Sequence, residues 1–284
     1  MAERSLIINA DDFGFCKETN RAIRELFAAR LISSTSLLVT AEEVLEAATI
    51  IKEDNLNFGV HLTLNSDFSK YPWKVAYQGR SSLNDGRGYL LSDTKEIAKK
   101  AKSKDVTLEC EAQFDLVNSL GITPDHFDNH SGTMYGINLR PFFINAFRLS
   151  KKYDLPFRFP KRNNFLNSYF SGKVPGYIRF AHKMILGVGK ICGAQLIDDI
   201  ISNPFSMKDI SSYEDLEDYY LNQVSNIGLG VTEMFFHPSY ASEKYNKITP
   251  EWQKREYELK FLMSGKLQKR VAEEGIKIIS YKDI

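Results

Sequence analysis

Two adjacent carboxylates follow the first apolar segment of the chain, where Leu6-Ile7-Ile8 leads into Asn9-Ala10-Asp11-Asp12-Phe13-Gly14. Like charges raise each other's pKa, so this adjacency is useful mainly when a cation or a proton-transfer role separates the two side chains. Asp11 and Asp12 are therefore candidates for catalysis or metal binding at the end of a first strand. The structural alternative is an Asp-rich turn that begins a helix.

The distribution of histidine favours the functional alternative. Of the five histidines in the chain, four lie in or at the end of segments that are typical of strands: His61, His126, His130 and His237. In an α/β barrel the carboxyl ends of the strands meet at one face, which holds the active site. We therefore expect one constellation there, made of Asp11, Asp12, His61, His130, Arg158 and His237. A single histidine on an apolar strand is more often a buried core residue, and that alternative stays open.

One carboxylate and two imidazoles make a metal-ligand set that leaves positions open for water and substrate. The ligands that we expect are Asp12, His61 and His130. His126 lies on the same strand face as His130 but deeper in the barrel, where a structural role or a place behind the ligands is expected. Asp128, between the two histidines, can orient a ligand imidazole.

Strand and helix signals alternate along the whole chain, which predicts a mainly parallel sheet with helical crossovers. After the opening strand, the expected strands are Ser34–Val39, Asn57–Leu64, Asp125–His130, Leu155–Phe159, Val231–Phe236 and Ile276–Tyr281. Helical spacing of apolar residues and helix-end signals predict helices between them at about 22–31, 44–51, 92–121, 140–152, 177–190, 211–224 and 249–275.

These elements predict a single domain over residues 1–284, with a distorted (β/α) barrel that is similar to a TIM barrel. An insertion is expected around residues 160–208, where the chain is irregular, aromatic and locally basic. It is either a lid over a sugar or a plain insertion. Residues 66–91 are expected to form a functional loop over one end of the barrel, or else a tolerated surface insertion.

Composition excludes several other classes of protein. The chain has 37 basic and 36 acidic side chains, so nucleic acid or an anionic membrane is not expected as a partner. Its three cysteines lack the spacing of a disulfide framework or of a thiolate zinc site. Neither a signal peptide nor a membrane-spanning segment is recognisable. We expect a cytoplasmic protein that is not embedded in a membrane, and a homodimer is plausible.

Four motifs resemble those of the YdjC-like carbohydrate deacetylases, a family that includes chitooligosaccharide deacetylase. The motifs are Asn9–Gly14, Gly59–Leu64, Pro124–His130 and Glu233–Pro238, and their order and spacing agree with the family over nearly the whole chain. The resemblance implies a distorted (β/α) barrel, one divalent metal ion and removal of acetyl groups from a small N-acetylated sugar. Diacetylchitobiose, a chitooligosaccharide or a phosphate of either is the implied substrate.

Carried onto this chain, the resemblance places the metal on Asp12, His61 and His130. Similarity to the wider polysaccharide deacetylases implies that Asp11 is the general base, Arg158 its charge partner and His237 the general acid. The family is usually described with magnesium, whereas two imidazole ligands favour zinc or another transition ion. His130 is followed by Ser131-Gly132-Thr133-Met134, whereas many family members have further histidines there, and this departure leaves the identity of the substrate open.

Two alternatives to this activity remain open. In one, the protein uses the metal but hydrolyses a different bond, that of another amide or of a phosphoester. The other is a catalytically silent barrel that binds sugar. A silent barrel needs neither a base nor an acid, so the presence of Asp11 and His237 speaks against it.

Overall fold

The computed structural model describes residues 3–67, 71–136, 140–170 and 172–284. Its strands form one sheet in the order β4-β3-β2-β1-β6-β5, in which every neighbouring pair is parallel, and β7 pairs with the beginning of β1. The strands are β1 (Arg4–Phe13), β2 (Ser34–Leu37), β3 (Phe58–Leu62), β4 (His126–Asn129), β5 (Asp199–Ile201), β6 (Gly230–Phe236) and β7 (Lys277–Ile278).

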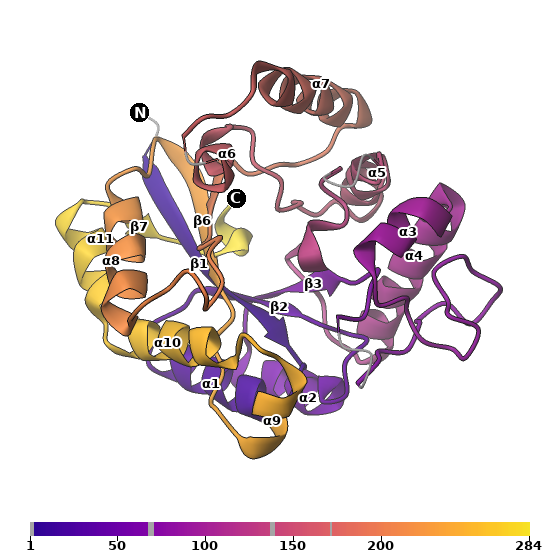
Figure 1. The fold of residues 1–284 in the computed structure, drawn as a ribbon, viewed down its shortest axis with the longest axis horizontal. Coiled ribbons are helices and arrows are strands. Elements are labelled where there is room, and N and C mark those ends of the chain that lie inside the picture. The colour runs from indigo at the N-terminus through magenta and orange to yellow at the C-terminus, as the bar shows by residue number, and fades with distance from the viewer. Residues whose placement is uncertain (1–2, 68–70, 137–139, 171) are drawn as a thin grey trace.

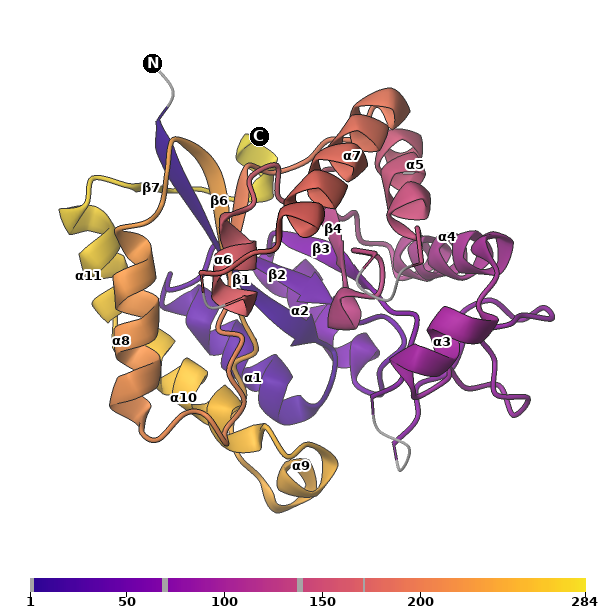
Figure 2. The same ribbon diagram turned by 45° about the horizontal axis from the view of Figure 1, so that its top comes forward.

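Helices surround this sheet, as Figures 1 and 2 show. The α-helices are α1 (Lys17–Ala28), α2 (Val44–Asp54), α3 (Thr94–Lys100), α4 (Ser103–Ser119), α5 (Phe143–Tyr153), α6 (Asn164–Tyr169), α7 (Gly176–Cys192), α8 (Tyr213–Val224), α9 (Glu243–Ile248), α10 (Trp252–Met263) and α11 (Lys266–Glu273). Two short 3-10 helices, η1 (His130–Gly132) and η2 (Tyr281–Asp283), follow β4 and β7. No helix within the described ranges is both long and apolar enough to cross a membrane.

The sheet closes into a barrel through single residues instead of regular strands. Phe157 forms one parallel bridge with Phe127 of β4 and another with Leu196, which lies three residues before β5. The gap between β4 and β5 is thus filled by one residue that pairs on both sides. This confirms the predicted distorted (β/α) barrel and explains the distortion.

Side chains alternate between the inside of the barrel and the helices outside it, as the period of two along a strand requires. On β1, Leu6, Ile8 and Ala10 pack into the large apolar cluster that the helices cover. Ile7 belongs to a smaller cluster inside the barrel, together with Ile200, Ile279 and Tyr281. Asn9 and Asp11 share the face of Ile7, so the inner face changes from apolar to polar toward the carboxyl end of the strand.

The structure differs from the predicted elements at several boundaries. The expected strand at Leu155–Phe159 is only the bridge at Phe157, and the closing strand ends at Ile278, after which the chain turns into η2. The expected helix at 249–275 is two helices, because Gly265 adopts a φ of 69° between α10 and α11. The segment around residues 160–208 contains α6, α7 and β5, and α7 confirms the helix predicted there.

Candidate active site

A bulge in β1 brings both aspartates into the barrel. Ala10 pairs with Thr35 and Phe13 with Leu37, so β1 contains one residue more than β2 over this stretch. Asp12 is in the left-handed region with a φ of 68°, a conformation that is strained for a residue other than glycine. Without the bulge, adjacent residues would face opposite sides of the sheet. Asp11 and Asp12 are instead both about 1% exposed and reach the same interior.

The three predicted metal ligands lie together. Asp12 Oδ1 is 3.4 Å from His61 Nε2 and 3.5 Å from His130 Nδ1, and the two imidazole nitrogens are 3.2 Å apart. His61 comes from β3, and His130 is the residue at which β4 passes into η1. One carboxylate oxygen and two ring nitrogens therefore face a common point from three strands of the barrel.

Each of the three side chains is held from behind by a charged neighbour. His61 Nδ1 is 2.6 Å from Asp128 Oδ1, and His130 Nε2 is 2.5 Å from Asp67 Oδ2. Arg255 Nη1 lies 2.7 Å from Asp12 Oδ2, the oxygen that faces away from the histidines. Carboxylates behind ligand imidazoles fix their orientation and tautomer, so this ring of neighbours preorganises the group.

These neighbours set the protonation of the group. Burial raises the pKa of Asp12, but Arg255 and the neighbouring His130 and His237 together outweigh this effect and hold that pKa well below the usual range. Burial lowers the pKa of His130, but Asp67 and Asp12 raise it to about 10. At His61, burial lowers the pKa and the charge of Asp128 raises it, and the pKa is raised overall. In the absence of a cation, the carboxylates thus favour protonated imidazoles.

Arg158 forms an ion pair with Asp11, the other aspartate of the motif. Its Nη1 and Nη2 each lie 2.7 Å from one oxygen of Asp11, a bidentate pair with both side chains about 2% exposed. The same guanidinium is 2.9 Å from Asp128 Oδ2 and 3.0 Å from Glu233 Oε1. Asn9 Nδ2 also donates to Asp11 at 2.7 Å. Asp11 is therefore held in place by a buried cation that serves three carboxylates.

His237 follows β6 and reaches Asp11 from the side that opens to solvent. Its Nε2 lies 3.8 Å from Asp11 Oδ2, and its side chain is 33% exposed. Glu258 of α10 accepts a 2.6 Å hydrogen bond from the backbone N–H of His237 and one of 2.8 Å from the Tyr220 hydroxyl. Burial lowers the pKa of the His237 imidazole; Asp12 opposes this effect and Arg255 adds to it.

A divalent cation fits the point between Asp12, His61 and His130. Asp12 Oδ1 is buried and accepts no hydrogen bond of regular geometry from the part of the chain that is described. Asp11, His61 and Asp128 also cluster, but the guanidinium of Arg158 already lies on both carboxylates there. The first group is therefore the better metal site. Two nitrogen donors and one oxygen donor suit a catalytic ion with open positions.

Within the described chain, carboxylates outnumber guanidinium groups around this point, which also favours a cation. Two guanidinium groups, Arg158 and Arg255, lie among six carboxylates. The carboxylates are Asp11, Asp12, Asp67, Asp128, Glu233 and Glu258. A divalent ion would offset part of this excess in a site where water screens little.

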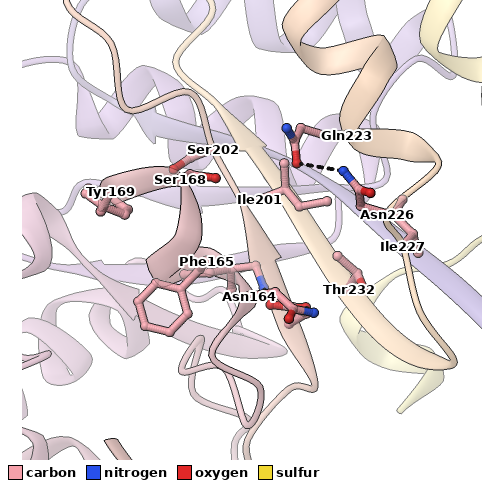
Figure 3. A pocket seen from close by; sticks show the side chains of 12 residues that line it. Asn164, Phe165, Ser168, Tyr169, Ile201, Ser202, Gln223, Asn226, Ile227 and Thr232 are labelled. Atoms are coloured by element: carbon pink, nitrogen blue, oxygen red, sulfur yellow. Dashed lines mark hydrogen bonds between the residues drawn. The ribbon is translucent and has the colours of Figure 1, made fainter. Parts of the chain in front are cut away.

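Two hollows elsewhere on the molecule do not contain this constellation. One of about 40 Å³ lies between α6, β5 and α8, where Asn164, Thr232 and Gln223 line it (Figure 3). That volume is far below the roughly 300 Å³ or more of a typical ligand site. The other hollow, of about 400 Å³, lies over the outer side of α10 beside Tyr240 and Tyr257. Among the charged side chains of the constellation and its neighbours, those of His237 and Asp67 are the most exposed to solvent, at 33% and 31%.

All six predicted site residues thus lie close together, whereas sequence reasoning missed Asp67, Arg255 and Glu258. Asp67 lies in the long loop after β3, where no periodicity indicates an orientation. Arg255 and Glu258 did leave a signal. They share the spacing of the buried Leu259 and Leu262, so charged residues occupy the apolar stripe of a helix, and a buried charge needs a partner.

Known proteins match this chain over almost its whole length. A carbohydrate deacetylase of Thermoanaerobacter pseudethanolicus is 26% identical over 97% of each chain, and one of Clostridium beijerinckii is 25% identical over 98% of this chain and 99% of its own. A crystal structure from Enterococcus faecalis V583, described as a candidate cellobiose-phosphate cleavage protein, has the same fold. Its TM-score is 0.77, with 24% identity and 99% coverage of both chains. The family model described as YdjC-like protein matches residues 5–273, so this chain belongs to the YdjC-like family.

Proposed function

We propose that this protein is a metal-dependent deacetylase that hydrolyses the N-acetyl group of a small sugar to a free amine and acetate. The substrate class that we propose is diacetylchitobiose, a chitooligosaccharide or a phosphate of either. Relatives named carbohydrate deacetylases support the reaction class. The observation that carries the proposal is the Asp12, His61 and His130 group beside the Asp11–Arg158 pair and His237.

Asp12, His61 and His130 would hold the metal ion. When bound there, a divalent ion would polarise the acetyl carbonyl and lower the pKa of a water molecule. The family resemblance implies magnesium, whereas the two imidazole donors favour a transition ion such as zinc, manganese or cobalt. The burial of this group supports the same role, because charges act more strongly where water is excluded.

Asp11 is the proposed general base. Hydrolysis forms a bond between a water oxygen and the acetyl carbon, and a base must accept the proton that this water loses. The bidentate contact with Arg158 holds the carboxylate of Asp11 in one orientation, so it cannot swing toward Asp12. Its Oδ2 lies on the side of His237, which opens to solvent.

His237 is the proposed general acid. Breaking the C–N bond leaves an amine that departs poorly unless it receives a proton. The His237 backbone is fixed on Glu258, and its Nε2 lies close to Asp11. Base and acid therefore approach a substrate from neighbouring positions. Asp11 accepts one proton from water and His237 gives one proton to nitrogen, so the proton count balances over one turnover.

The first experiment measures acetate release from diacetylchitobiose by metal-stripped protein to which magnesium, zinc, manganese or cobalt is restored in turn. Metal-dependent release that Asp11→Asn abolishes would support the proposal, and the order of the metals would decide the ion. Absence of release with every metal, despite tight binding, would contradict deacetylation of this substrate. A panel of other N-acyl and phosphoester substrates would then follow.

Metal content separates ligands from catalytic residues. We expect His61→Ala and His130→Ala to lose the metal, because each removes one of three donors. Asp11→Asn and His237→Ala should retain it and lose turnover. Elemental analysis of the four purified variants provides the measurement. Retention in the opposite pattern would contradict the assigned roles.

A further inference from the structure

The segment that follows β7 places one side chain inside the barrel. After β7, Ser280 and Asp283 cap the 3-10 turn η2, with Ser280 N–H and Oγ donating to Asp283 Oδ2 at 2.8 and 2.9 Å. Figures 1 and 2 show the C-terminal end beside β6. Tyr281, the first residue of this turn, is 1% exposed and belongs to the inner apolar cluster. A residue near the end of the sequence therefore fills the floor beneath the candidate site.

The ring of Tyr281 has a fixed place on this floor. It stacks on the His126 ring with centroids 3.7 Å apart and planes at 8°. His126 also lies against Gly59, where an added Cβ atom would overlap the His126 ring. Only glycine leaves room for this imidazole. His126 is thus a packing residue of the floor, in agreement with its expected structural role.

The hydroxyl of Tyr281 connects this floor to the proposed base. It donates a hydrogen bond to Glu233 Oε2, and the other oxygen of Glu233 lies 3.0 Å from Arg158 Nη1. The same Nη1 donates to Asp11 Oδ1 at 2.7 Å. Burial and the nearby carboxylate of Glu233 raise the pKa of Tyr281 well above its usual value, so the phenol keeps its proton and remains the donor.

We propose that Tyr281 is a positioning residue, whose hydroxyl holds Glu233 and thereby keeps Arg158 paired with Asp11. This inference rests on the proposed function in one respect, the role of Asp11 as base. Three carboxylates share the Arg158 guanidinium, namely Asp11, Asp128 and Glu233. The position of Arg158 therefore depends on how firmly each carboxylate is held by its other partners.

Each of the three carboxylates is also held by a partner other than Arg158. Asp128 is bonded to Ser36 Oγ and His61, and Asp11 to Asn9 Nδ2. Glu233 accepts one hydrogen bond from Arg158 through Oε1 and one from Tyr281 through Oε2. Loss of the Tyr281 hydroxyl leaves this buried Oε2 without its donor, and Glu233 then draws more strongly on Arg158.

The test compares Tyr281→Phe with Tyr213→Phe. The first variant keeps the ring that stacks on His126 and removes only the hydroxyl. The second removes a matched tyrosine–glutamate hydrogen bond outside the site, where the Tyr213 hydroxyl donates to Glu217 at 2.5 Å. We expect Tyr281→Phe to lower kcat about 10- to 100-fold with KM changed less than about twofold, as for other residues that act through a neighbour. Tyr213→Phe should retain the kcat of the wild type.

A double-variant series shows whether the hydroxyl acts through Glu233. Tyr281→Phe combined with Glu233→Gln should lower kcat no further than Glu233→Gln alone, because both changes interrupt the same connection from Tyr281 through Glu233 to Arg158. Additive losses would overturn the inference. An unchanged kcat in Tyr281→Phe would overturn it as well.

Nitrogen NMR of protein labelled at arginine tests the positioning without turnover. Arg158 signals, assigned by their loss in Arg158→Lys, should shift and their guanidinium protons should exchange faster in Tyr281→Phe but not in Tyr213→Phe. Unchanged Arg158 signals in Tyr281→Phe would refute the positioning role. Absence of acetate release by the wild type would instead contradict the proposed function, while the NMR comparison would still decide the role of Tyr281.

Discussion

Replacing Asp67 by asparagine tests whether a charged neighbour tunes His130 as a metal ligand. Asp67 Oδ2 lies 2.5 Å from His130 Nε2, whereas His130 Nδ1 faces Asp12. The amide of the Asp67→Asn variant would keep an acceptor oxygen in a side chain of similar shape and remove the charge. Because the pKa of His130 is raised to about 10, this imidazole is protonated at neutral pH in the metal-free protein. Metal binding must then release a proton.

Asp67→Asn should have two effects of opposite sign on metal affinity. Loss of the partner behind a ligand imidazole lowers affinity by about 10- to 100-fold, or roughly 1.4 to 2.7 kcal/mol. We expect the lower end, because the Asp67 side chain is 31% exposed and its charge is partly screened. The charge of Asp67 is also the main cause that raises the pKa of His130 against the effect of burial. Its removal therefore weakens the competition between protons and the metal for His130.

The two effects separate with pH. In the wild type, the Kd of the metal should fall at least about tenfold per pH unit between about pH 7 and 9, since His130 loses one proton on binding the metal below its pKa. The His130 pKa is lower in the variant, so its Kd should fall less steeply. The wild type therefore gains affinity relative to Asp67→Asn as pH rises.

Calorimetric titration of metal-stripped protein at pH 7, 8 and 9 measures both effects. Trp73 gives a second readout by fluorescence, because its ring lies 5.1 Å from that of His130. The control is Asp85→Asn, which removes a carboxylate of the same loop that pairs with Arg87 at 2.7 Å. Equal slopes of affinity against pH in Asp67→Asn and the wild type would refute the reasoning.

Three further predictions follow from the buried contacts. Arg158→Leu leaves three buried carboxylates without their cation and should lower the free energy of unfolding by about 3 to 5 kcal/mol, measured in urea. Gly59→Ala should cost about 1 to 3 kcal/mol because its Cβ meets His126, whereas Gly176→Ala, with no atom within 4 Å, should cost nothing; thermal unfolding compares them. Because the pKa of His237 lies below 6.5, kcat should fall as pH rises through that lowered value, and His237→Ala should lose this dependence in a pH–rate profile.

The sequence predicted the strands and the residues at their ends because these depend on local pattern. Short apolar segments bounded by turn residues identify β1, β3, β4 and β6, and parallel strands bring their carboxyl ends to one face. Asp12, His61 and His130 could be grouped on that basis alone. Their role as metal ligands stays a prediction, as do the roles of Asp11 and His237.

Features that depend on tertiary contacts could not be predicted. The expected strand at 155–159 contributes only Phe157, because its pairing is set by its neighbours in the barrel and not by its own pattern. The expected closing strand ends early, and Tyr281 turns inward to a partner 48 residues away. Asp67 reaches His130 from a loop across 63 residues. Such contacts leave no periodic signal in either partner.

The bulge in β1 explains how two adjacent aspartates can differ in function. Two like charges buried side by side repel each other strongly, so one would be expected to bind a proton. Here Asp11 faces Arg158, which follows the bridge at Phe157, whereas Asp12 faces Arg255 on α10. Each carboxylate thus has its own cation from a distant part of the chain. Because the partners differ, Asp12 keeps one oxygen toward the histidines and Asp11 keeps one toward His237, and neither side chain can replace the other.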